Sequence, residues 1–215
     1  MNKIIETMLG HIPNNVSLVI ITPLPSTFNK LSKKIDITEY YDSGFFENYN
    51  FKTANNKIGM LILSPQGSAA KDVIELFSDT NILFFGMAGC LNSKYKIGDL
   101  VEVKEAIDKY KNNTILYTTE KYPKVNCGYS PCLVGKIAQK YCEIARENNC
   151  DVVDMETTYC AQTAIEKNNK LTTLLLISDI PEIINFWELS DAQKKELKVG
   201  REKAIDEIIN HINAL

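Results

Sequence analysis

Two acidic residues follow a short apolar run in the segment DVVDMETTYC, residues 151–160. Asp154 ends the run, and Glu156 falls where an expected strand gives way to a helix. Acids are common at helix starts because they interact favourably with the helix dipole, each by about 0.3–1 kcal/mol. A carboxylate at such a junction can also accept hydrogen bonds from the adjacent hydroxyls of a ribose, and the flexible thioether of Met155 can pack on the sugar. For Glu156 both interpretations are open, whereas Asp154 is most simply a capping or structural residue.

A third acid ends another apolar run, in LLLISDIPE (174–182). Asp179 follows Ser178 at the mouth of the expected strand, and Pro181 closes the turn. Burial at this point would raise the pKa of the Asp179 carboxyl group and suit it to donating a proton. An Asx-type turn or a helix cap is an equally good interpretation of the same residues.

Two glycines stand three positions apart in GMAG, residues 86–89, after a third apolar run. Glycine lets a backbone approach a ligand closely, which makes Met87, Ala88 and Gly89 candidate substrate-binding positions. Taken alone, a tight turn is the simpler interpretation.

The elements that must position these residues are indicated by the pattern of the chain. Short apolar runs bounded by Gly, Pro, Asn or Asp predict strands over 17–22, 57–64, 81–89, 99–107, 150–155 and 171–178. Helical spacing predicts helices over 68–79, 130–149 and 190–215, the last with Ser190 as N-cap. In the second helix, Leu133 and Ile137 are expected to face the sheet.

This alternation of strands and helices predicts a three-layer α/β fold around a central mixed, mainly parallel sheet. A length of 215 residues fits a single domain over residues 1–215. Ligands of such sheets bind beyond the carboxyl ends of the strands, where the acidic segments and GMAG are expected to converge.

Composition limits the classes of function. Hydrophobic residues make up 45% and charged residues 24%, as in a folded globular protein. The net charge of −3, with lysines scattered among acids, provides no basic surface for nucleic acid. Residues 1–15 lack the long apolar segment of a membrane helix or an export signal, so we expect no membrane association and a cytoplasmic location.

The cysteines and histidines bear on metals and cofactors. Six cysteines are present without a CxxC pair, and the two histidines lie near opposite ends of the chain. We therefore expect buried, reduced thiols, no metal site and no cofactor.

Together, the three segments resemble the signatures of the purine nucleoside and uridine phosphorylase superfamily. GMAGCLNSKYKIGDLVEV is similar to its GTAGGL…GD(L/V)V signature, VVDMETTYCAQTA to its VDMEgaA helix start, and LLLISDIPE to its (R)aISD strand end. Their order and spacing agree from about residue 17 to the C-terminus. The hydrolytic branch is the most similar, namely 5'-methylthioadenosine/S-adenosylhomocysteine nucleosidase and futalosine hydrolase. The latter has features similar to the IITPLPS segment and to Trp187.

The resemblance implies hydrolysis of the N-glycosidic bond of a purine nucleoside, the small-molecule substrate. Met155 and Glu156 would contact the ribose, while Asp179, beside Ser178, would protonate N7 of the departing purine. The segment VNCGYSP (125–131) would be the loop that frames the base, with Tyr129 as one wall.

A homo-oligomer, most simply a dimer, is also implied by the resemblance. The aromatic-rich segment YYDSGFFENYNF (40–51) is a candidate contact between subunits. A hairpin at the sheet edge explains its aromatic residues equally well.

Departures from the family pattern bear on the nucleophile. The chain has two arginines, Arg146 and Arg201, both in predicted helices away from the strand ends, and Met87 stands where the phosphorylases have Thr or Ser. Because the guanidinium fork matches phosphate oxygens best, water is favoured over phosphate as the nucleophile.

Hydrolysis has its own difficulty, because the TPLPST loop (22–27) contains no acid that could activate water. Asp42 or Glu47 would have to supply it from elsewhere. The alternatives left open are therefore a phosphorolytic enzyme and a nucleoside-binding member with little or no activity. In a third alternative, the three family-like segments have only a structural role.

Overall fold

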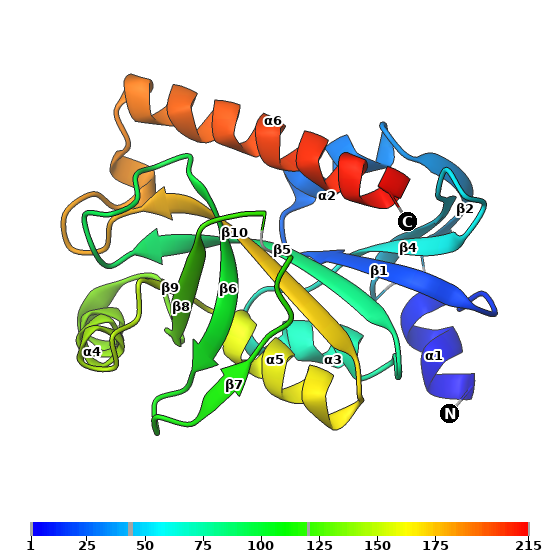
Figure 1. Cartoon of the computed structure of the whole chain (residues 1–215), viewed down its shortest axis with the longest axis horizontal. Coiled ribbons are helices and arrows are strands. Elements are labelled where there is room, and N and C mark those ends of the chain that lie inside the picture. The colour runs from blue at the N-terminus through cyan, green and yellow to red at the C-terminus, as the bar shows by residue number, and fades with distance from the viewer. Residues whose placement is uncertain (1, 43–44, 120, 215) are drawn as a thin grey trace.

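The computed structural model describes residues 2–42, 45–119 and 121–214, and a single mixed sheet forms its centre (Figure 1). All six predicted strands are confirmed, and four further strands add to them. The strands are β1 (Val16–Thr22), β2 (Asp36–Asp42), β3 (Glu47–Lys52), β4 (Ile58–Leu63), β5 (Asn81–Cys90), β6 (Leu100–Ile107), β7 (Asn113–Ile115), β8 (Lys124–Tyr129), β9 (Val152–Asp154) and β10 (Lys170–Asp179).

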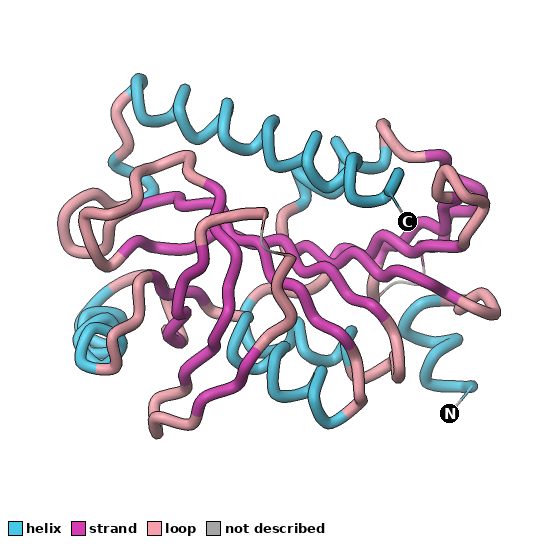
Figure 2. Tube along the Cα trace, viewed as in Figure 1, coloured by secondary structure: helices cyan, strands magenta, loops and turns pink. Residues whose placement is uncertain are grey.

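Helices cover both faces of this sheet, as Figures 1 and 2 show. The helices α2 and α6 lie on one face, α1, α3 and α5 on the other, and α4 beside β8 and β9. Their bounds are α1 (Asn2–Leu9), α2 (Pro25–Ser32), α3 (Lys71–Ile74), α4 (Gly135–Glu147), α5 (Thr157–Glu166) and α6 (Asp191–Ala214), with short 3₁₀ turns η1 (Gly67–Ala70) and η2 (Phe186–Glu188).

The sheet closes on itself at one side. Its strand order is β10-β6-β8-β9-β5-β1-β4-β3-β2, and β10 also pairs with β5. Parallel pairings join β4, β1, β5 and β10 in the centre and β6, β8 and β9 at the side. The other pairings are antiparallel. The predicted α/β class and mixed sheet are confirmed, but the sheet curls into a closed barrel and is less predominantly parallel than predicted.

Alternation along the central strands explains why their apolar runs are continuous. In β5, Ile82 and Phe84 belong to the core under α3 and α5, whereas Leu83 and Phe85 belong to the core under α6. Successive side chains of a strand point to opposite faces, so a strand covered on both faces needs apolar residues at every position. The same double coverage holds β10 in place and fixes the position of its last residues.

The predicted closing helix is confirmed and begins with a capping box. The amide N–H of Gln193 donates to Ser190 Oγ at 3.3 Å, and the amide N–H of Ser190 donates to Gln193 Oε1 at 2.9 Å. These reciprocal bonds satisfy backbone donors that a helix start leaves unpaired.

The other two helix predictions are only partly right. The helix expected over 68–79 is reduced to η1 and α3, and the one expected over 130–149 begins at Gly135. Leu133 and Ile137, expected against the sheet, are 66% and 61% exposed. Instead α4 buries its small residues, Ala138, Cys142 and Ala145, which let the helix pack closely on β8 and β9.

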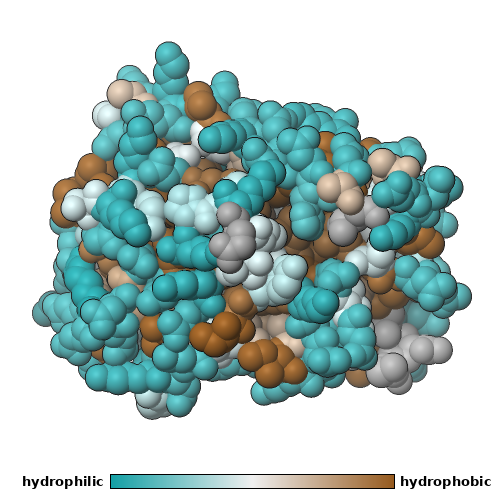
Figure 3. Space-filling view, in the orientation of Figure 1, coloured by the Kyte–Doolittle hydropathy of each residue, from teal (hydrophilic) through white to brown (hydrophobic). Residues whose placement is uncertain are grey.

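The outer surface is mostly hydrophilic on the face that Figure 3 shows, with a small group of hydrophobic side chains over β7 and α5. Within the described residues no helix is long and apolar enough to cross a membrane. All six cysteines are free, and five of them are buried, as predicted; Cys132 is partly exposed. The segment 40–51 includes parts of β2 and β3, which form a hairpin at the sheet edge, and its residues 43 and 44 lie outside the described residues.

Candidate active site

A cavity of about 460 Å³ lies where the ends of β1, β5, β9 and β10 come together, and we call it the strand-end cavity. The DMET, SDIPE and GMAG segments all line it, which confirms that they converge. Of the predicted site residues, the cavity is lined by Met87, Ala88, Gly89, Met155, Glu156, Ser178 and Asp179. Tyr129 is outside this lining.

Glu156 is a buried carboxylate and not a solvated helix-start charge, because the residue is only 7% exposed. The loop after β4 wraps over it, and the N–H of Gly67 donates to Glu156 Oε1 at 2.6 Å. Gly67 has a φ of +70°, a conformation that suits glycine. Burial raises the pKa of Glu156, and hydrogen bonds from the backbone of Gly67 and Met155 partly oppose this shift. The carboxyl group is therefore held rigidly at the cavity wall.

Asp154 also borders the cavity, but its oxygens are occupied inside the protein. Both accept from the N–H of Thr157 at 3.1 Å, Oδ2 accepts from the Thr157 hydroxyl, and Oδ1 accepts from Cys127 Sγ at 3.5 Å. Burial, and next the charge of Glu156, raise the pKa of Asp154 to about 7. The capping role expected for Asp154 is thereby confirmed, since it satisfies the first N–H of α5.

Asp179 ends β10 and faces the strand-end cavity. Burial raises its pKa, and a hydrogen bond from the Ser178 hydroxyl to Asp179 Oδ1, at 2.6 Å, partly opposes the shift. Ser178 Oγ also lies 3.3 Å from the carbonyl oxygen of Ala88. A carboxyl group with a raised pKa keeps its proton to higher pH, so this one is suited to donate a proton to a ligand in the cavity.

The GMAG glycines stand in a strand, so the simpler interpretation of a tight turn is wrong. Residues 86–89 are part of β5, which continues to Cys90. A Cβ atom added to Gly89 would lie 2.5 Å from Pro181 Cγ and 3.5 Å from Asp179 Oδ2. Glycine is needed there because the loop after β10 packs directly on the backbone of β5, where Asp179 lies opposite Gly89.

Tyr129 occupies a different environment from the one expected. The segment 125–131 is not a loop, because β8 runs through Tyr129. The Tyr129 ring packs edge-on against Tyr141 and Tyr159, with centroids 5.7 and 5.0 Å apart. On this side the cavity wall is instead formed by the residues after β8 and by α4, notably Ser130, Cys132, Leu133, Val134 and Gln139.

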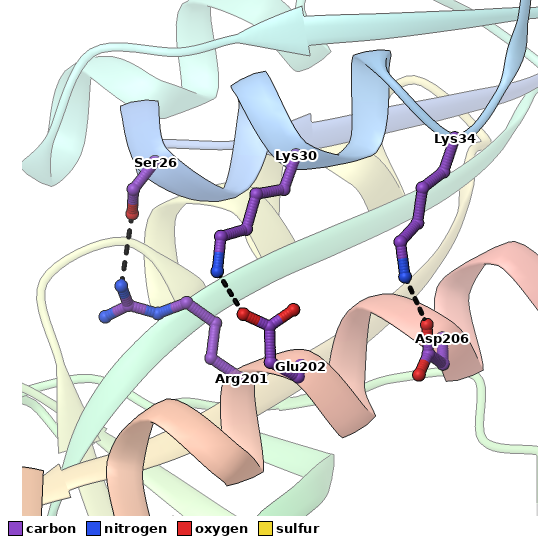
Figure 4. A network of polar contacts seen from close by, with 6 residues as sticks. All are labelled: Ser26, Lys30, Lys34, Arg201, Glu202 and Asp206. Atoms are coloured by element: carbon purple, nitrogen blue, oxygen red, sulfur yellow. Dashed lines mark hydrogen bonds and ion pairs between the residues drawn. The ribbon is translucent and has the colours of Figure 1, made fainter. Parts of the chain in front are cut away.

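Arg201 lies at the strand ends, so its predicted position away from them is wrong. The helix α6 passes alongside α2, and Arg201 Nη1 donates to Oγ of Ser26, in the first turn of α2, at 3.2 Å (Figure 4). Its Nη2 lies 3.7 Å from Met87 Sδ, and its Nε is buried without a partner. Beside this contact, ion pairs of Lys30 with Glu202 and of Lys34 with Asp206 join α2 and the turn that follows it to α6.

The missing acid of the TPLPST loop is not replaced by Glu47. Pro25 begins α2, as proline often does at the first helical position, and the loop brings Pro23 and Leu24 to the cavity. Glu47 lies on β3, outside the cavity lining, and its Oε1 is 3.4 Å from the Tyr40 hydroxyl. The Asp42 side chain lies outside the described part of the structure.

The charge of the cavity limits what it can bind. Four carboxyl groups line it, those of Asp154, Glu156, Asp179 and Glu182, and no lysine, arginine or histidine is among its described lining residues. Such a lining disfavours anions and favours neutral ligands with several hydroxyl or amino donors. With a hydrogen-bonded acceptor at Glu156 and an acid of raised pKa at Asp179, the site can hold a polyhydroxylated ligand and donate a proton to a leaving group.

The chain is similar to known proteins in sequence and in fold. A sequence model of the phosphorylase superfamily matches residues 17–145. A sequence search of curated proteins found no match.

Solved structures share the fold at low sequence identity. Helicobacter pylori MTAN has a TM-score of 0.73 and 13% identity, over 93% of this chain and 100% of that chain. The 5'-methylthioadenosine/S-adenosylhomocysteine nucleosidase from Neisseria meningitidis, in complex with methylthio-immucillin-A, has a TM-score of 0.74 and 16% identity over 93% and 99%. A futalosine hydrolase mutant of Helicobacter pylori strain 26695 has a TM-score of 0.68 and 13% identity over 89% and 99%.

Proposed function

Because the chain belongs to the phosphorylase superfamily, we propose that it is a nucleosidase that releases a purine base by hydrolysis of the N-glycosidic bond. One observation carries the proposal: Asp179, a partly buried acid with a raised pKa, faces the same cavity as the carboxyl group of Glu156, which the backbone N–H of Gly67 holds in place. Cleavage of an N-glycosidic bond needs a proton on the leaving base and an environment that tolerates positive charge on the sugar. These two groups supply both.

Each carboxyl group has one role in the proposed reaction. Asp179 donates its proton to purine N7 as the base departs, which for a positioned general acid contributes about 10²–10⁴-fold in rate. Glu156 accepts hydrogen bonds from the ribose hydroxyls and stabilises the developing cation, while Met155 packs on the sugar. The base lies towards Ser178, Ala88 and Gly89, and Met87 lies towards the sugar.

Water is the proposed nucleophile because of the charge of the cavity. A phosphate dianion would enter a space lined by four carboxyl groups, and Met87 offers it no hydroxyl donor. Arg201 contacts both Ser26 and the cavity residue Met87, and we propose that Arg201 and Ser26 hold the water molecule by hydrogen bonds. No carboxylate of the TPLPST loop deprotonates that water, so a slow turnover is expected.

Phosphorolysis is the second candidate, and Arg201 is the observation that favours it. Its guanidinium group has an unpaired Nε and lies beside the Ser26 hydroxyl, and arginine is the side chain best matched to phosphate oxygens. A single arginine has to outweigh the carboxyl groups of the cavity for phosphate to bind. A nucleoside-binding protein without turnover is the third candidate, favoured by the acid-free loop after β1.

The test substrates are the nucleosides named for proteins of similar fold, together with adenosine and inosine. Release of free base is measured with 5'-methylthioadenosine, S-adenosylhomocysteine, futalosine, adenosine and inosine, each with and without phosphate. We expect base release from at least one of them at a rate that phosphate does not change. Dependence on phosphate would move the protein to the phosphorolytic candidate. Tight binding without release would support the binding protein, and neither binding nor release would reject all three.

We also propose that the chain forms a homodimer through the β2–β3 hairpin. Tyr40 and Phe45 on this edge are 50% and 65% exposed, large apolar surface for a free monomer. Sedimentation of the wild type and of Phe45→Ser tests this, and a monomeric wild type would contradict it.

A further inference from the structure

The loop after β10 carries a second acid into the strand-end cavity. Residues 180–184 form a tight loop closed by backbone bonds from Ile180 N to Ile184 O at 3.0 Å and from Ile184 N to Ile180 O at 2.8 Å. Glu182 stands at its tip with a φ of +72°. A side chain longer than glycine rarely adopts this left-handed conformation, and such residues concentrate at functional sites. The left-handed backbone of Glu182 therefore makes this residue a candidate for a functional role.

Glu182 is oriented by an arginine from the neighbouring helix. Arg146 of α4 forms an ion pair with Glu182, with Arg146 Nη1 2.9 Å from Glu182 Oε2, and the two side chains are 37% and 33% exposed. The other oxygen, Oε1, has no donor among the described residues. Glu182 thus lines the cavity with one carboxylate oxygen fixed and one available to a ligand.

Glu182 lies at the same end of the cavity as Asp179. Pro181, between them in sequence, rests on Gly89, and Cys142 of α4 lines the wall beside both acids. The pKa of Cys142 is raised to about 11, mainly by burial, and the charges of Arg146, Glu182 and Asp179 also act on it. One wall therefore joins the proposed proton donor to the Glu182 carboxylate.

A purine protonated at N7 presents its C6 substituent on the same edge of the ring. That substituent is an amino donor in adenine and a carbonyl acceptor in the 6-oxopurines. A carboxylate accepts a hydrogen bond from the amino group and repels the carbonyl oxygen, so its presence beside Asp179 distinguishes the two classes of base.

We propose that Glu182, held by Arg146, is a specificity-determining residue that selects 6-aminopurines over 6-oxopurines. The inference rests on the proposed function for the orientation of the base. It adds a residue outside the acid and ribose motifs and names the class of base that this site accepts.

Binding of the free bases tests the selection without requiring turnover. Trp187, the sole tryptophan, lines the cavity and is 54% exposed, so its fluorescence is a direct reporter of occupancy. We expect the wild type to bind adenine about tenfold or more tightly than hypoxanthine, and Glu182→Gln to lose most of this preference. Glu147→Gln removes an exposed carboxylate next to Arg146, outside the cavity, and should leave the preference unchanged.

A second variant separates selection from stability. Glu182→Gly removes the carboxylate and relieves the left-handed backbone, so it should lose the preference for adenine without a lower melting temperature. The inference is overturned if the wild type binds neither base or shows no preference, or if Glu182→Gln and Glu182→Gly keep the wild-type preference.

Turnover distinguishes failure of this inference from failure of the proposed function. If no nucleoside is cleaved but the adenine preference is lost in Glu182→Gln, the nucleosidase proposal fails and the selection stands. If nucleosides are cleaved and the ratio of kcat/KM between adenosine and inosine is the same in wild type and Glu182→Gln, the selection fails and the nucleosidase proposal stands.

Discussion

The ends of β9 and β10 each carry an acid as the last residue of the strand, and the two acids have opposite roles. Asp154 ends β9, and both of its oxygens accept hydrogen bonds, from Thr157 and Cys127. Asp179 ends β10 and has one partner, the hydroxyl of the preceding serine. The first acid therefore fixes the start of a helix, whereas the second is left with an oxygen facing the cavity.

The difference arises in the segment that comes directly after each strand. After β9 the chain enters α5 almost at once, so the N–H of Thr157 at the helix start donates to Asp154. The next acid, Glu156, lines the cavity instead. After β10 the chain makes a tight loop that is not the start of a helix, and within the described residues no backbone N–H donates to Asp179. An acid at a strand end is thus predicted to lie near the cavity. Whether it binds a ligand or caps a helix depends on whether unpaired backbone N–H groups lie next to it.

Loss of the Asp179 proton should have the largest effect. Asp179→Asn keeps the shape of the side chain but cannot donate an acidic proton, so kcat for base release should fall about 10²–10⁴-fold. To measure kcat, the reaction is stopped at successive times and the released base is quantified by chromatography. Asp154→Asn is the matched comparison at the other strand end, and an equal loss of kcat in both variants would contradict the division of roles.

Removal of the Glu156 charge should have the next largest effect. Glu156→Gln weakens charge-assisted hydrogen bonds to the ribose, so kcat/KM for a nucleoside should fall about 10–100-fold. The affinity for free adenine, which lacks the sugar, should change less than about threefold. A variant that loses only thermal stability, with nucleoside affinity intact, would support the purely structural interpretation of the DMET segment.

Asp154 should act on stability and its pH dependence. Its pKa is raised from 3.8 to about 7 in the folded state, so the folded state holds the extra proton between these values. The stability that Asp154 contributes is therefore fully present below pH about 4 and is lost as the pH rises through about 7, by an amount on the order of a few kcal/mol. Urea unfolding across this range measures the slope. In Asp154→Asn the slope should flatten, and an unchanged slope would assign the effect to another group.

The Ser178 hydroxyl should have the smallest effect. Its hydrogen bond holds the pKa of Asp179 below the value that burial alone would give. Without it, in Ser178→Ala, the pKa of Asp179 should rise, so the loss of kcat at high pH should begin at higher pH than in the wild type. At a pH where Asp179 is protonated in both proteins, kcat should differ by only a few-fold. A pH profile shifted the opposite way would remove Asp179 as the proton donor.

Much of the cavity can be predicted from the sequence because its residues sit at the ends of strongly apolar strands. The rule that ligands bind at strand ends predicts that Met87, Glu156 and Asp179 lie together. The strands β2, β3 and β8 are not predicted because their polar and aromatic residues interrupt the apolar pattern, and β7 is not predicted because it has only 3 residues. Tyr129 is expected in a loop because of the resemblance to the family, although it belongs to β8.

Two arginines show what local patterns cannot supply. The contact of Arg201 with Ser26 depends on the angle at which α6 crosses the sheet, and residues 175 positions apart carry no local signal of it. Likewise, the pairing of Arg146 with Glu182 requires α4 to pack by its small residues, with Leu133 and Ile137 exposed. The apolar periodicity of the 130–149 segment favours the opposite face.

The source of the oxygen in the sugar product tests the central claim most directly. The protein is incubated with a cleaved nucleoside in ¹⁸O-labelled water that also contains phosphate, and the sugar product is analysed by mass spectrometry. Hydrolysis predicts a free sugar that carries ¹⁸O at C1', with no sugar 1-phosphate. Formation of a sugar 1-phosphate without ¹⁸O at C1' would contradict the account and show that phosphate is the nucleophile.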